Sequence, residues 1–183
     1  MSDYLPLPAQ VADICRSVQA PPRLVAHLTL VHDVAFQLTD QLTTSFPKLA
    51  FDRDLVLFGA ATHDIGKAIY PSELSGPGSM HEEHGADILK KFGVRDEQSR
   101  FTRTHAQWNT TTVDIEDLLV ALADKCWKGK RDTELEEKTV QLIAKNTGQE
   151  AWEIFSILDD ILQKLAADAD ERLTWQAQFS VEN

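Results

Sequence analysis

The chain has 183 residues and 43% hydrophobic content, which is enough for one domain with a substantial buried core. Its formal net charge of −11 opposes binding to duplex nucleic acid, although a bound cation can reverse the local field for a small anion. Because there is no long apolar run, no signal peptide and only two cysteines, Cys15 and Cys126, we predict a cytoplasmic protein that does not bind membranes and keeps both thiols reduced and buried.

Apolar residues recur at intervals of three and four along nearly the whole chain, which predicts an all-α fold. The predicted helices are 9–19, 23–45, a third that starts at Asp52 or Asp54 and runs to His63, 81–92, 96–108, one that starts at Thr112 or Asp114 and reaches Trp127, 133–145 and 149–165. A loop rich in Gly, Pro and Ser occupies 71–80, and the tail 166–183 either extends the last helix or frays. No repeat and no alternating pattern is present, so we predict a single domain over 1–183.

The stretch 55–67, LVLFGAATHDIGK, ends its helical spacing at His63 and Asp64. Adjacent helical residues point about 100° apart, so a histidine and a carboxylate grip one ion best where a helix stops. We expect Gly66 to provide that stop, because glycine accepts the left-handed conformation common just past a helix end.

Two further polar residues interrupt apolar stripes. His27 lies between Leu24 and Val31 on the second predicted helix, and Asp124 follows the apolar run 118–123. A buried imidazole or carboxylate is costly unless it is paired or binds a metal. Imidazole and carboxylate together suit a divalent cation, and do not discriminate among Mn, Fe, Ni, Co, Zn and Mg. Any one of the histidines alone is more often an ordinary core or surface residue.

The order of His27, His63-Asp64 and Asp124 resembles the HD-domain metal-dependent phosphohydrolase superfamily, whose signature is a histidine, an HD doublet and a later aspartate. His27 is followed by valine and alanine at the family spacing, HDIGK is a common form of the doublet, His81-x3-Gly85 is similar to the HPxxG element, and LADK at 122–125 is similar to the final aspartate motif. The resemblance covers roughly 22–130, leaves 131–183 as additional C-terminal helices, and implies an HD-domain-like helical bundle.

The resemblance implies that one divalent ion is held by His27, His63, Asp64 and Asp124. His81 and His105 are candidates for a second ion. His32 is the rival of His27, but only His27 gives the family spacing. Glu82 replaces the family's proline, and His105 is a single histidine where the cyclic-dinucleotide branch has a pair, which argues against that substrate.

The implied activity is hydrolysis of a phosphate ester. A bound divalent ion lowers the pKa of water from 15.7 to about 7 and neutralises phosphoryl oxygens. We expect Asp64 to hold or deprotonate this water and Lys67 to contact a phosphate oxygen, with Arg103 and Lys128 as further phosphate-binding candidates; each of these cations could instead simply face water at a helix end.

The predicted partner is a small phosphorylated substrate, with nucleotides among the candidates. The alternative is a non-catalytic HD-type regulatory module that binds a nucleotide or a protein. Glu82 and Glu83 are candidates to orient His81, and the loop 72–80 is either a lid or a plain connector. The oligomeric state is not predicted, because the apolar face of Trp152, Phe155, Ile157 and Leu158 suits either a core or a dimer contact.

Overall fold

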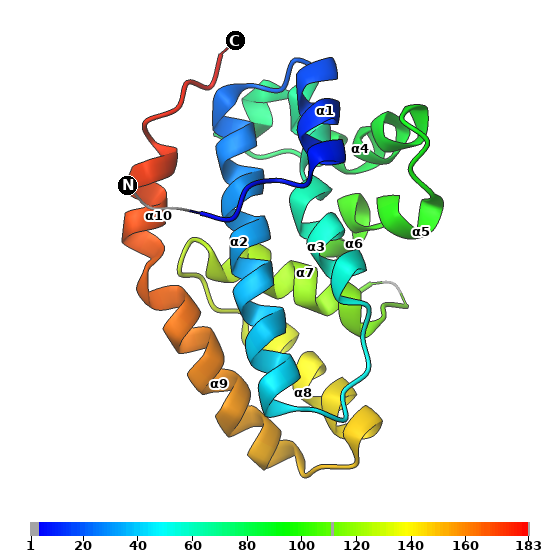
Figure 1. Cartoon of the computed structure of the whole chain (residues 1–183), viewed down its shortest axis with the longest axis vertical. Coiled ribbons are helices and arrows are strands. Elements are labelled where there is room, and N and C mark those ends of the chain that lie inside the picture. Colours follow the sequence, from blue (N-terminus) through cyan, green and yellow to red (C-terminus); the bar gives the residue numbers. More distant parts are fainter. Residues whose placement is uncertain (1–3, 111, 183) are drawn as a thin grey trace.

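The computed structural model describes residues 4–110 and 112–182 (Figure 1). Within these residues the regular structure is entirely helical, which confirms the predicted all-α class. No helix in the described part is long and apolar enough to cross a membrane.

The α-helices are α1 (Ala9–Ser17), α2 (Pro22–Ser45), α3 (Arg53–Thr62), α4 (Met80–Lys91), α5 (Asp96–Ser99), α6 (Phe101–Gln107), α7 (Ile115–Cys126), α8 (Thr133–Thr147), α9 (Ala151–Ala167) and α10 (Ala169–Gln176). Two short 3₁₀ turns, η1 (Ile65–Ala68) and η2 (Pro71–Leu74), lie between α3 and α4. The side chain of Asp52 caps α3 by accepting a hydrogen bond from the backbone N–H of Leu55 at 3.0 Å, so the first of the two predicted starts is the one observed. The predicted helix 96–108 is divided at Arg100, which itself keeps helical backbone angles.

The tail extends α9 only as far as Ala167, and beyond that residue the prediction is wrong, because the described chain neither continues the helix nor frays. It forms the separate helix α10, which packs against α2 and α9. The segment after α10 is anchored to Arg23 at the start of α2. The Arg23 side chain donates hydrogen bonds to the carbonyl oxygens of Phe179 and Ala177, both at 3.1 Å, and its backbone N–H donates to the carbonyl oxygen of Ser180 at 2.9 Å. Asn183 lies outside the described residues.

Helix α2 is the central element of the fold. It packs against α3, α7, α9 and α10, and Figure 1 shows it with α3 on one side and with α9 and α10 on the other. Two hydrophobic clusters meet along it. The larger one is built around α2, α7, α8 and α9, and the smaller one joins α1 to parts of α2, α3 and α4. On α2, Leu24 and Leu28 belong to the smaller cluster and Leu30 belongs to the larger one. His27 lies among these residues, so the polar site described below is located where the two clusters meet.

Cys15 and Cys126 are free and buried, as predicted. The apolar face predicted on α9 is divided in the structure. Leu158 is buried in the larger cluster and Ile157 packs against it, whereas Trp152 is 70% exposed and Phe155 is 50% exposed. The two aromatic side chains therefore are not part of the core.

Candidate metal centre

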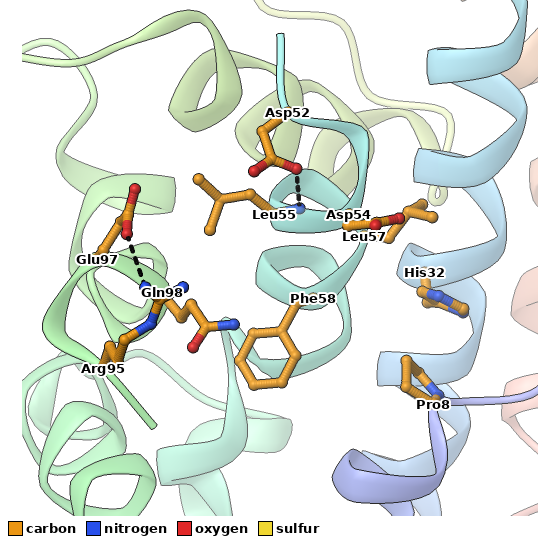
Figure 2. A pocket seen from close by; sticks show the side chains of 10 residues that line it. All are labelled: Pro8, His32, Asp52, Asp54, Leu55, Leu57, Phe58, Arg95, Glu97 and Gln98. Atoms are coloured by element: carbon orange, nitrogen blue, oxygen red, sulfur yellow. Dashed lines mark hydrogen bonds and ion pairs between the residues drawn. The ribbon is translucent and has the colours of Figure 1, made fainter. Parts of the chain in front are cut away.

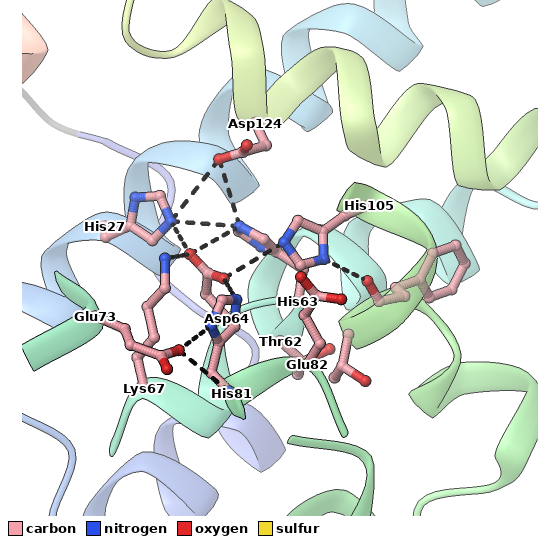
Figure 3. A network of polar contacts seen from close by, with 12 residues as sticks. His27, Thr62, His63, Asp64, Lys67, Glu73, His81, Glu82, His105 and Asp124 are labelled. Carbon is pink, nitrogen blue, oxygen red and sulfur yellow. Dashed lines mark hydrogen bonds and ion pairs between the residues drawn. The ribbon is translucent and has the colours of Figure 1, made fainter. Parts of the chain in front are cut away.

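Helix α3, which precedes the HDIGK stretch, ends at Thr62, and the chain passes through His63 and Asp64 into η1. His63 keeps helical backbone angles, whereas Asp64 has φ −107° and ψ 12°. This change of backbone direction lets both side chains enter one cluster, with His63 Nε2 3.5 Å from Asp64 Oδ2 (Figure 3). The pair therefore lies at a helix end, as the sequence predicted.

The reason we expected for Gly66 is wrong. Gly66 lies inside η1 and is not among the glycines with positive φ, so it does not end a helix through a left-handed conformation. A Cβ atom at this position would instead overlap the backbone carbonyl of His81. Glycine is needed here because α4 approaches the backbone of η1 closely, and this approach brings His81 to the doublet.

Four of the predicted ligands converge although they lie far apart in the chain. His27 Nε2 lies 2.9 Å from Asp64 Oδ2 and 3.3 Å from His63 Nε2. Asp124, near the end of α7, places Oδ1 3.5 Å from His63 Nε2 and 4.0 Å from His27 Nε2. The side chains of His63 and Asp64 are almost completely buried, and that of Asp124 is 13% exposed.

The two candidates for a second ion lie on the other side of Asp64. His81 Nε2 is 3.1 Å from Asp64 Oδ1, and His105 Nε2 is 3.5 Å from the same oxygen. The two oxygens of Asp64 therefore face different imidazoles, with Oδ2 toward His27 and His63, and Oδ1 toward His81 and His105 (Figure 3).

Three of the imidazoles are oriented by contacts at their second ring nitrogen. His63 Nδ1 lies 2.9 Å from the carbonyl oxygen of Ala60, and His105 Nδ1 lies 2.9 Å from that of Phe101. A carbonyl only accepts hydrogen bonds, so in both rings Nδ1 carries a proton and Nε2 is the nitrogen that faces the cluster. His81 Nδ1 lies 2.5 Å from Glu73 Oε2.

Glu73 takes the place that we predicted for Glu82 or Glu83. Glu82 is buried but accepts a hydrogen bond from Gln107 at 2.5 Å, and Glu83 is exposed. The expectation that one of them orients His81 is therefore wrong. Glu73 was missed because it lies eight residues before His81, in a segment with no periodic pattern.

The donor set fits a divalent cation. Two imidazole nitrogens, those of His27 and His63, face each other at 3.3 Å in a buried site. His81 Nε2 and Asp64 Oδ1 are buried without a hydrogen-bond partner among the described residues, because their 3.1 Å approach lacks hydrogen-bond alignment. Buried polar atoms without partners are costly, and a cation between such atoms would satisfy them. Two groups of side chains have ligand atoms close enough to share an ion: His27, His63 and Asp124, and His63, Asp64 and His105.

The electrostatics of the cluster are dominated by its two carboxylates. Burial lowers the pKa of His63, but the charge of Asp64 and hydrogen bonds with Asp124 and Asp64 outweigh it and raise that pKa to about 9. Burial and the neighbouring charge of His63 lower the pKa of His105 to about 4. Burial alone would raise the pKa of Asp64 and of Asp124, yet contacts with His63 help to hold both well below the ordinary value. Both carboxylates are therefore charged at neutral pH.

The family model for the HD domain matches residues 9–128, which is more than half of the chain. The chain belongs to the HD-domain family. Comparison with curated proteins and with solved structures found no match. Members of the HD-domain family are mostly metal-dependent phosphohydrolases, and some are regulatory.

His32, the rival of His27, lies outside the cluster of this HD domain. Figure 2 shows it beside Pro8 in a pocket that is also lined by Asp54, Phe58 and Arg95. Its ring is buried, and its Nδ1 has no hydrogen-bond partner among the described residues. The structure thus brings His27, and not His32, to the HD doublet.

A cavity of about 360 Å³ opens above the candidate ligands of the HD domain. Lys67 lines it and places Nζ 2.6 Å from Asp64 Oδ2. Lys128 also lines it, with Nζ 3.4 Å from both oxygens of Asp124. Arg103, in contrast, is exposed on α6 and does not line the cavity.

Trp127 and Gln176 are among the side chains that line the cavity and that were missed as site residues. Trp127 packs edge-on against His27, with ring centroids 4.9 Å apart. Gln176 comes from α10, beyond the part of the chain that matches the HD-domain family. Its position depends on how the tail folds back onto α2, and no local sequence signal indicates that.

Proposed function

We propose that this HD-domain protein is a metal-dependent phosphohydrolase that cleaves a phosphate ester of a small molecule, with nucleotides among the candidates. In this proposal His27, His63, Asp64 and Asp124 hold one divalent cation. His81 and His105, with Asp64, would hold a second one. The observation that supports the proposal is the position of Asp64, whose two buried oxygens lie within 3.5 Å of four imidazole nitrogens.

A divalent cation in such a site supplies a water of lowered pKa and neutralises phosphoryl oxygens. The chain contributes position and charge. Lys67 and Lys128 stand on the cavity wall and, as mobile point charges, would contact phosphate oxygens. If only the first cation binds, Asp64 Oδ1 would accept a hydrogen bond from the attacking water and so orient it.

The charge distribution supports a small anionic substrate. The whole chain is strongly acidic, yet both lysines of the cavity lie against the candidate ligands. A bound cation would withdraw Asp64 and Asp124 from these ion pairs and leave the two ammonium groups available to a phosphate. The cavity of about 360 Å³ is large enough for a small molecule.

The experiment combines metal analysis with a substrate panel. We expect the purified protein to contain a stoichiometric divalent metal, and to hydrolyse at least one member of a panel of phosphomonoesters, phosphodiesters and nucleotides. Turnover should be lost with a chelator and restored by Mn²⁺, Fe²⁺, Ni²⁺, Co²⁺, Zn²⁺ or Mg²⁺. Stoichiometric metal without chelator-sensitive turnover on any member would instead favour a regulatory HD-type module that binds a nucleotide or a protein. Absence of metal after incubation with these ions would contradict both functions.

A further inference from the structure

Glu73 is nearly buried although it comes from an otherwise exposed segment. Its side chain is 8% exposed, whereas Pro71, Ser72 and the stretch 75–80 are exposed. The carboxylate accepts three hydrogen bonds: from His81 Nδ1 at 2.5 Å, from the backbone N–H of His81 at 3.2 Å and from that of Met80 at 3.2 Å. A surface glutamate with only a solvation role would not be held in this way.

The first of these contacts sets the direction of the His81 ring. Because the carboxylate accepts, Nδ1 of His81 carries a proton, and Nε2 is the nitrogen that faces Asp64 Oδ1, at 3.1 Å. A carboxylate behind a histidine ligand fixes its orientation and increases its basicity, and loss of such a carboxylate typically weakens metal affinity about 10–100-fold.

The other two contacts fasten the segment 71–80. The first N–H groups of a helix have no partner within the helix, and Ser79 at the N-cap of α4 makes no side-chain cap hydrogen bond. Glu73 supplies acceptors to two of these groups, and so ties η2 to the start of α4. A Cβ at Gly78 would overlap the Glu73 carboxylate, so the chain passes directly against it. Leu74 and Gly78 from this segment also line the cavity above the candidate ligands.

We infer that Glu73 is a positioning residue that couples closure of the segment 71–80 to binding of a cation through His81. One carboxylate holds both the ring of His81 and the chain that covers it. Opening of the segment therefore releases His81, and a cation on His81 holds the segment closed. The inference rests on the proposed function, because it requires a cation at the His81 side of Asp64.

A role limited to helix capping makes a different prediction. A cap stabilises the segment 71–80 but does not change metal affinity. Measurements of metal binding and of backbone exchange on the same variants therefore separate the two roles.

The experiment uses Glu73→Gln, with Glu83→Gln as the matched control. Glu83 lies in the first turn of α4, is exposed and loses the same charge. Mn²⁺ binding is measured by isothermal titration calorimetry, and exchange of the amides of 71–81 is measured with and without Mn²⁺. We expect wild-type protein and Glu83→Gln to bind two ions, with slower amide exchange when Mn²⁺ is present. In Glu73→Gln we expect one of the two sites to weaken about 10–100-fold and the protection by Mn²⁺ to be lost.

Two further variants test the inference, and the first of them does so even if Glu73→Gln is poorly folded. Gly78→Ala pushes on the Glu73 carboxylate without removing charge, and should weaken the same site. The double variant with Glu73→Gln and His81→Ala should bind Mn²⁺ no more weakly than His81→Ala alone, because Glu73 acts through His81.

Wild-type-like Mn²⁺ binding in Glu73→Gln, when His81→Ala loses one ion, would overturn the inference and leave the proposed function intact. An additive effect in the double variant would also overturn it. Failure of the wild-type protein to bind Mn²⁺ would instead overturn the proposed function itself.

Discussion

Replacement of Asp64 by asparagine is the most direct perturbation of the candidate metal centre. The side chain keeps its size, but one carboxylate oxygen becomes an NH₂ group and the negative charge is lost. In either orientation the NH₂ group would face imidazole nitrogens, those of His27 and His63 from one position or those of His81 and His105 from the other. A hydrogen-bond donor then occupies the place where a cation would bind, so we expect Asp64→Asn to bind no metal.

The size of the effect follows from ligand linkage. A ligand at 100 times its Kd stabilises the folded state by about 2.7 kcal/mol. For a chain of 183 residues, 1 kcal/mol shifts Tm by about 2–4 °C. Wild-type protein should therefore melt about 5–10 °C higher with saturating Mn²⁺ than with a chelator. Asp64→Asn should show no difference.

The assay is thermal unfolding followed by circular dichroism, with each variant compared with its own chelator-treated sample. This reference removes any change in stability that comes from the lost ion pair with Lys67. Asp87→Asn on the exposed face of α4 is the matched control, and should retain the full Mn²⁺ shift. A shift of wild-type size in Asp64→Asn, or full turnover in that variant, would refute the assignment of Asp64 as a ligand.

Three other measurements test separate parts of the site. Lys128→Ala removes an ammonium group that lies 3.4 Å from Asp124 and is 27% exposed; we expect KM for a phosphate ester to rise about tenfold with unchanged metal content, and an unchanged KM would exclude a phosphate contact. Gly66→Ala places a Cβ against the backbone carbonyl of His81. We expect the free energy of unfolding, measured with urea, to fall by about 1–3 kcal/mol and Mn²⁺ binding to weaken. Wild-type values of both would show that α4 can move away freely. The raised pKa of His63, about 9, keeps its imidazole protonated at pH 7 in metal-free protein. Mn²⁺ binding should therefore release about one proton and should weaken as the pH falls. Proton release is measured by calorimetry in buffers of different ionisation enthalpy, and a result of no release would contradict this expectation.

Local sequence patterns singled out His27, His63, Asp64 and Asp124 because each of them breaks a local rule, whereas His81 and His105 were expected only from the family resemblance. His27 and Asp124 stand on apolar helix faces, and His63-Asp64 stands where a buried helix ends. Such polar residues need partners when the face is buried, and the structure supplies them from one another. Helical periodicity likewise predicted most helices to within a few residues, because their apolar stripes are continuous.

The features that sequence did not predict depend on contacts between segments. Gly66 is explained by the approach of α4, and Glu73 by a contact with a helix that starts seven residues later. Gln176 reaches the cavity only because the tail folds back onto α2. None of these residues is unusual within its own local pattern, so periodicity and spacing carry no information about them.

The place of the site in the fold accounts for both its rigidity and its cost. It lies where the two hydrophobic clusters meet along α2, so the ligands come from elements that both clusters hold in place. Asp64 and Asp124 repel each other there, and contacts with the lysines and His63, which a cation can replace, offset this repulsion. The site therefore has a fixed geometry, yet Asp64 Oδ1 and His81 Nε2 are buried there without a hydrogen-bond partner among the described residues. Its ligands therefore need little rearrangement to bind a divalent ion, and the free energy of binding should appear mainly as added stability of the fold.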